Sequence, residues 1–130
     1  MDQKILVGDR LTDEMISVGR ELVQRLEKKL TIVGAFWYLL PEPIKWRLVL
    51  STPAVRIDGP IKSYQKVQRT AKQLIPTIDV ADVALISDKE PFYMMLKSAI
   101  HTGQGLGSIR FTNNVINGQH ISDAFLYRVS

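Results

Sequence analysis

Residues 108–130, SIRFTNNVINGQHISDAFLYRVS, decide the fold of this 130-residue chain. They read as two strands joined by Asn117-Gly118. An Asn-Gly pair between two alternating segments predicts a β-hairpin, because both central residues of a type I′ turn need a positive φ. The position of the turn then fixes the pairing of the two strands.

That pairing assigns the side chains of the hairpin to two faces. It sets Ile109 opposite Leu126 and Phe111 opposite Ala124, and this apolar face is predicted to point into the core. The other face is predicted to carry Arg110, Thr112, Asp123, Phe125 and Tyr127. A long side chain such as Arg110 reaches both its opposite and its diagonal neighbours.

A second hairpin is predicted upstream. Residues 31–40 are β-branched and aromatic, Pro41-Glu42-Pro43 ends the run, and residues 46–52 form the next strand. With Leu40 opposite Trp46, one face carries Phe36, Tyr38, Leu48 and Leu50. The other face then carries Ala35, Trp37, Arg47, Val49 and Ser51. A shift of one residue in register would exchange these two sets.

Three further segments have the apolar period of a helix. They begin at Thr12, a predicted N-cap, at Gly59-Pro60, and at Ser87-Asp88-Lys89-Glu90, which matches a capping box. Gly103 is a predicted C-cap of the last helix, whereas residues 53–58 are expected to be irregular. The apolar run 83–86 predicts one more, buried strand.

The element order is therefore helix, strand, strand, helix, strand, helix, strand, strand (αββαβαββ). It predicts a single α+β domain over residues 1–130, with a mainly antiparallel sheet of about five strands. The three helices are expected mostly on one face of that sheet.

Composition favours a globular cytoplasmic protein. Apolar residues make up 45% of the chain and charged residues 23%, which excludes a disordered polymer. There is no cysteine, so disulfides and thiolate metal sites are excluded. We find no targeting signal, and the longest apolar run, residues 32–40, is about half a membrane span, so no membrane association is predicted. The net charge of +4 permits contact with an anion or a nucleic acid without arguing for it.

The two predicted hairpins together suggest one functional surface, a sheet face with interleaved aromatic and charged side chains: Trp37, Arg47, Arg110, Asp123, Phe125 and Tyr127. Such a face is typical of a homodimer or partner interface, or of a surface that stacks ligands or nucleotides. An ordinary half-exposed sheet face with cation–π contacts and ion pairs explains it equally well.

A second candidate surface lies on the middle helix. Lys62, Lys66 and Arg69 are spaced i, i+4 and i+7, so they share one helix face. This face is either solvated or able to contact the phosphates of a nucleic acid, and phosphate contacts make binding depend on salt.

No motif in the chain predicts catalysis. We find no nucleophile elbow, no metal-ligand spacing around His101 or His120, and no phosphate loop at residues 103–107. We therefore predict no catalytic residue, metal or cofactor. The leading hypothesis is a non-enzymatic binding or interaction module that forms a homodimer. The alternatives are a nucleic-acid-binding domain and a small enzyme with a pocket near Arg110 and Asp123.

The chain also resembles a group of small bacterial proteins without assigned activity. The resemblance rests on these motifs: Ala35-Phe36-Trp37, Trp46-Arg47-Leu48, Ser51-Thr52-Pro53, Asp58-Gly59-Pro60 leading to Tyr64, Ile116-Asn117-Gly118, and Ser122 to Arg128. It covers most of the chain from residue 20 onward. It implies a single α+β domain, and it suggests a gene carried on a mobile cassette.

Overall fold

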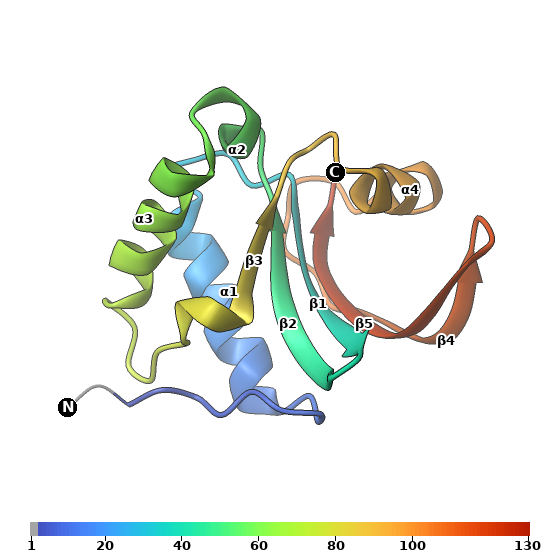
Figure 1. The fold of residues 1–130 in the computed structure, drawn as a ribbon, viewed down its shortest axis with the longest axis horizontal. Coiled ribbons are helices and arrows are strands. Elements are labelled where there is room, and N and C mark those ends of the chain that lie inside the picture. Colours follow the sequence, from blue (N-terminus) through green and yellow to red (C-terminus); the bar gives the residue numbers. More distant parts are fainter. Residues whose placement is uncertain (1–2) are drawn as a thin grey trace.

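The computed structural model describes residues 3–130 and shows an α+β fold built on one five-stranded sheet (Figure 1). The strands are β1 (Gly34–Pro41), β2 (Ile44–Ser51), β3 (Val83–Ile86), β4 (Ile109–Ile116) and β5 (Gln119–Val129), arranged in the order β3-β2-β1-β5-β4. Every neighbouring pair is antiparallel except β2 and β3, which are parallel. The predicted fold class and both predicted hairpins are confirmed.

The helices are α1 (Asp13–Leu26), the short α2 (Ala54–Ile57), α3 (Pro60–Ala71), the 3-10 turn η1 (Val80–Asp82) and α4 (Pro91–Ala99). The predicted order of the three longer helices among the strands is confirmed. The segment expected to be irregular contains α2, a single turn that begins directly after Pro53. No helix within residues 3–130 is long and apolar enough to cross a membrane.

Two of the three longer helices lie on one face of the sheet, in agreement with the prediction, and α4 lies on the other face. Helices α1 and α3 cover one face, where Leu22 and Val67 pack in a core with Trp37, whereas α4 covers the other face, where Tyr93 packs with Phe36. The physical reason is that β1 is apolar on both sides. Its consecutive residues Phe36 and Trp37 are both almost completely buried, so each face needs its own cover.

The register of the C-terminal hairpin is confirmed. Ile109 pairs with Leu126, Arg110 with Phe125 and Phe111 with Ala124. Both turn residues have positive φ, 48° at Asn117 and 80° at Gly118, as the predicted turn requires. In Figure 1 this hairpin curls around α4, and near its tip Asn117 Nδ2 donates a hydrogen bond to Ser98 Oγ at 2.6 Å.

The register predicted for the first hairpin is wrong by one residue. Trp46 pairs with Leu39 rather than with Leu40, because the strands continue to Pro41 and Ile44 and leave a two-residue turn. As a result Trp37 pairs with Leu48, and Arg47 pairs with Tyr38. Trp37 and Arg47 therefore lie on opposite faces of the sheet.

The helix starts follow the sequence signals in two cases out of three. Thr12 caps α1 by accepting from the Met15 amide, and Pro60 occupies the first turn of α3. The capping box predicted at Ser87 does not form. Pro91 takes the first helical position of α4, which makes Glu90 the N-cap. Gly103 is also not the C-cap, since α4 ends at Ala99 and Ile100 follows as its cap.

An ion pair fixes the segment before α4. Arg56 Nε and Nη2 donate to the two Asp88 carboxylate oxygens, each at 3.1 Å. The hydrogen bond from Arg56 is the main cause that lowers the pKa of Asp88. A carboxyl group whose pKa falls on folding stabilises the protein above its unfolded pKa, and this contribution disappears as the pH falls through the folded pKa.

We therefore expect Asp88→Asn to lower stability at about pH 7, and we expect this effect to shrink steadily as the pH falls from about 4 toward about 2. Urea denaturation of both proteins across this range measures the difference. The same substitution in an Arg56→Gln background is the control, and there the pH dependence of the difference should shrink. A difference that stays constant with pH would contradict the role assigned to the pair.

Candidate functional site

The three aromatic residues of the predicted surface are core residues. Trp37, Phe125 and Tyr127 are 0%, 8% and 0% exposed and pack in the core on the α1 side of the sheet. Trp37 Nε1 donates to the Tyr127 hydroxyl at 2.9 Å, and that hydroxyl donates to the Ile16 carbonyl at 2.6 Å. Burial also raises the pKa of Tyr127. Because α1 covers this face, these three interface or ligand candidates are buried and form no exposed surface.

Gly19 lets α1 approach this pair of aromatic side chains. A Cβ atom at residue 19 would lie 2.5 Å from the Tyr127 hydroxyl oxygen and 2.8 Å from Trp37 Nε1. Both contacts are far shorter than van der Waals distance. The hydrogen bond between Trp37 and Tyr127 therefore requires glycine at position 19, because any side chain there would collide with the pair.

Arg110 and Asp123 lie together, as their places in the hairpin predict. Arg110 Nε and Nη2 each donate to an Asp123 oxygen at 2.6 Å, and this hydrogen bonding raises the pKa of Arg110. The guanidinium also lies over the Trp46 ring, 5.5 Å from its centroid. Both charged groups are thus satisfied by each other, and this favours a structural clasp across β4 and β5 over an acid or base that acts on a substrate.

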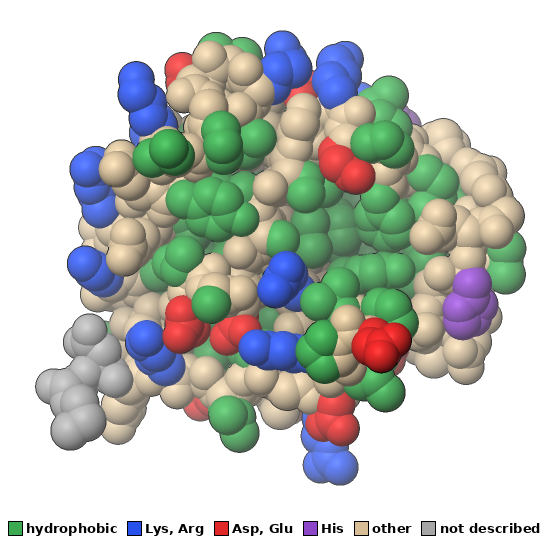
Figure 2. All heavy atoms as spheres, viewed as in Figure 1, with side chains coloured by type: hydrophobic (Ala, Val, Ile, Leu, Met, Phe, Trp, Pro, Cys, Tyr) green, Lys and Arg blue, Asp and Glu red, His purple; other side chains and the backbone are tan. Residues whose placement is uncertain are grey.

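Arg47 lies on the face that carries α4, which we call the α4 face. This helix covers only part of the face. Beside it the sheet presents half-buried side chains: Tyr38, Leu40, Val49, Ala84 and Ile86. Figure 2 shows apolar side chains gathered in a hollow in the middle of this view, between α4 and strands β2 and β3, with basic side chains below. We call these five residues together with Arg47 the open half of the α4 face.

The chemistry of this open half combines apolar contact area with one cation. Tyr38 packs edge-on against Phe92 of α4 with ring centroids 4.9 Å apart, and burial raises the pKa of its hydroxyl. Lys45, on the same face, is paired with Asp82 at 2.6 Å. Arg47 forms no ion pair with any residue of the described part of the chain.

The basic residues predicted on the middle helix do lie on α3. Lys62 and Arg69 are exposed, whereas Lys66 is half-buried. Lys66 lines a hollow of about 240 Å³ together with Lys29 and Asp58. The acidic group in this hollow reduces the positive potential available to a phosphate.

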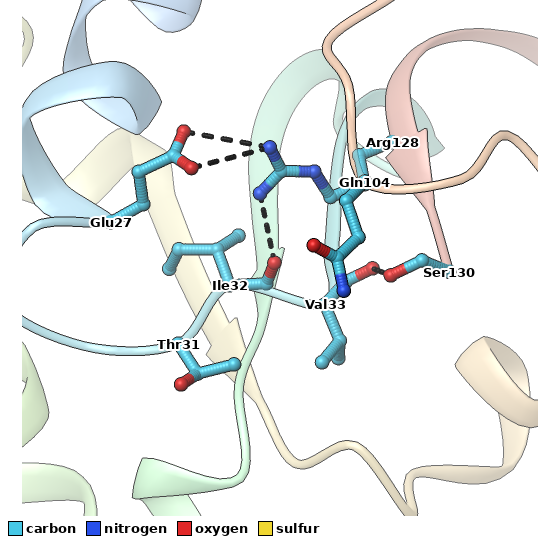
Figure 3. A pocket seen from close by; sticks show the side chains of 7 residues that line it. All are labelled: Glu27, Thr31, Ile32, Val33, Gln104, Arg128 and Ser130. Atoms are coloured by element: carbon cyan, nitrogen blue, oxygen red, sulfur yellow. Dashed lines mark hydrogen bonds and ion pairs between the residues drawn. The ribbon is translucent and has the colours of Figure 1, made fainter.

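A polar pocket that sequence reasoning missed lies between the end of α1, the start of β1 and the end of β5 (Figure 3). It has a volume of about 350 Å³, and it is lined by Glu27, Thr31, Ile32, Val33, Gln104, Arg128 and Ser130. Arg128 is only 6% exposed. Its Nη1 donates to the Ile32 carbonyl at 3.0 Å, and its Nη2 reaches the two Glu27 oxygens at 3.4 and 3.5 Å.

A β-bulge explains why the sequence did not indicate this pocket. Along β5, strict alternation would place Arg128 on the α4 face with Ala124 and Leu126. The register between β1 and β5 shifts between Ala35 and Phe36, so Arg128 pairs with Ala35 and turns toward α1. Neither the position nor the effect of this bulge is encoded in a short motif.

The chain matches no protein-family model, no curated protein and no solved structure. The resemblance to small bacterial proteins therefore stays a prediction. Within residues 3–130, no group of three or more histidine, aspartate or glutamate side chains is arranged to hold a metal ion.

Proposed function

We propose that the protein is a non-enzymatic interaction module that forms a homodimer through the open half of the α4 face. The observation that carries this proposal is a sheet face only partly covered by its helix. It leaves Tyr38, Val49 and Ile86 half-buried beside Arg47, which forms no ion pair with another of the residues 3–130. A second protein surface that covers these side chains would remove their apolar area from water, which drives association.

Charge complementarity favours a second copy of the chain as the occupant. Glu42 is exposed in the turn of the hairpin that carries Arg47, and it too forms no ion pair among residues 3–130. In a two-fold dimer each contact occurs twice with the roles of the subunits exchanged. Arg47 of one subunit then pairs with Glu42 of the partner subunit, and the reciprocal pair forms as well.

A charge-swap experiment tests this arrangement. We expect the wild-type protein to be a dimer by multi-angle light scattering and sedimentation, and Arg47→Glu to shift it to a monomer, because two carboxylates then face each other. Glu42→Arg should have the same effect. The double variant Glu42→Arg with Arg47→Glu should recover the dimer, since the pair is rebuilt with its charges exchanged.

Lys62→Glu is the matched control, because it makes the same charge change on the exposed side of α3 and should leave the dimer intact. A wild-type protein that is strictly monomeric at high concentration would refute the proposal. Failure of the double variant to recover the dimer would refute the pairing of Arg47 with Glu42.

Nucleic-acid binding is the alternative function, now confined to the α3 surface with Lys62, Lys66 and Arg69. It predicts binding that weakens steadily with added salt and that Lys62→Glu reduces. Binding that is absent at low salt as well as at high salt would exclude it. We also propose a cytoplasmic location, because a chain without cysteine gains nothing from an oxidising compartment.

A further inference from the structure

The pocket around Arg128 contains an arginine whose hydrogen-bonding edge is incomplete. In arginine, Nε–H and one N–H of Nη2 point in the same direction and match the two oxygens of a carboxylate. Arg128 Nε is buried and has no hydrogen-bond partner within the described chain. Its neighbour Nη2 has only the long contacts to Glu27 at 3.4 and 3.5 Å.

Two other arginines of the chain show what this edge does when it is satisfied. Arg110 binds Asp123 through Nε and Nη2 at 2.6 Å, and Arg56 binds Asp88 through the same two atoms at 3.1 Å. The Arg56 and Arg110 side chains are about half exposed, whereas the Arg128 side chain is 7% exposed. Arg128 is thus the most buried of these three arginines, and it is the one whose Nε–Nη2 edge binds no carboxylate through both atoms.

We propose that this pocket binds a small α-amino acid, with the ligand carboxylate on the Nε–Nη2 edge of Arg128 and the ligand ammonium against Glu27. The Glu27 carboxylate at the pocket wall supplies the partner for a cation and disfavours a phosphate or a dicarboxylate. The volume of about 350 Å³ is at the lower end of the range of ligand pockets, which suits a small ligand.

The remaining polar groups of the pocket suit the same ligand. Figure 3 shows Gln104 reaching across the pocket from the loop before β4, between the guanidinium and the backbone of Val33. Gln104 is exposed, so its side chain can change rotamer as a ligand enters the pocket. The Thr31 hydroxyl also lines the pocket and offers a further donor or acceptor, whereas the Ser130 hydroxyl already donates to the Val33 carbonyl at 3.0 Å.

The test follows the Nε–Hε resonance of Arg128 by ¹H–¹⁵N NMR while acetate or glycine is added to the full chain. Acetate supplies the carboxylate alone, and glycine adds the ammonium. We expect both to shift the Arg128 resonance and to slow its exchange with water, while the Arg56 and Arg110 resonances stay unchanged. Glycine should bind about tenfold more tightly than acetate, because it adds a charge-assisted hydrogen bond to Glu27.

Two variants complete the test. Glu27→Gln alters a side chain at the protein surface, and it should bring the affinities for glycine and acetate close together. Arg128→Lys keeps the charge but removes the two-atom edge, and it should abolish binding of both. If neither wild type nor Glu27→Gln responds to either probe at concentrations of about tens of millimolar, the proposal is overturned. Equal affinities of wild type for the two probes would overturn the amino-acid assignment.

Discussion

Replacing Trp37 with alanine should lower the free energy of unfolding by about 3–5 kcal/mol, the usual effect of removing a large buried aromatic side chain. Trp37 is fully buried between β1 and α1, and it donates the hydrogen bond that the Tyr127 hydroxyl accepts. The alanine variant leaves a cavity in the larger core and removes that donor. Equilibrium denaturation in urea, followed by circular dichroism, measures the change.

Arg47→Ala is the control, because sequence reasoning placed Arg47 on the same surface as Trp37. Arg47 lies on the opposite face, half-buried and outside any ion pair of the described residues, so we expect a change of about 1 kcal/mol or less when unfolding is measured at a dilution where the protein is monomeric. If Trp37→Ala does not fold, Trp37→Phe provides a measurable variant with a smaller loss, about 1–3 kcal/mol. Similar small effects of Trp37→Ala and Arg47→Ala would show that Trp37 is not a core residue.

The second large effect is expected at Gly34, where an alanine should destabilise the protein by about 2–4 kcal/mol. A Cβ atom at residue 34 would overlap the ring of Tyr93, which crosses the start of β1. That ring has little freedom to move, since its hydroxyl lies 2.9 Å from the Val33 carbonyl oxygen and 2.6 Å from the Ser130 carbonyl oxygen. Relief of the overlap therefore breaks hydrogen bonds or shifts α4.

Gly105→Ala is the matched control for this glycine substitution. Apart from its own chain neighbours, no described residue has an atom within 4 Å of the position that its Cβ would occupy, and its backbone needs no positive φ. We expect a change within about 0.5 kcal/mol in the same urea titration. A result in which both variants are equally stable would show that Tyr93 does not pack on Gly34.

The parts of the fold that could be predicted are those set by short-range chemistry. Asn117-Gly118 determined its own turn and thus every pairing in the C-terminal hairpin. The turn between β1 and β2 carries two prolines near its ends and no such marker, so the register of this hairpin was misjudged by one residue. A side-chain period of two turned that error into an exchange of faces. The position of α4 on the second face depends on contacts between distant segments, which local patterns do not encode.

The candidate sites also divide into contacts that short-range pairing sets and contacts that distant segments make only in the folded chain. The contact between Arg110 and Asp123 followed directly from the hairpin register. The burial of Phe125 and Tyr127 did not, because a pattern within one strand does not show whether its second face is open or covered by a helix. The pocket around Arg128 depends on three segments that meet only in the folded chain.

The bulge between β1 and β5 exchanges the faces of the sheet to which the last residues of β5 point. As a result, the Arg128 guanidinium lies beside Glu27, and Val129 packs in the core on the α4 face. Without the bulge, strict alternation of the same residues would place Arg128 in the apolar α4 core and Val129 in the polar pocket. Because of this one extra residue, β5 ends with its charged side chain in the polar pocket and its apolar side chain in the core.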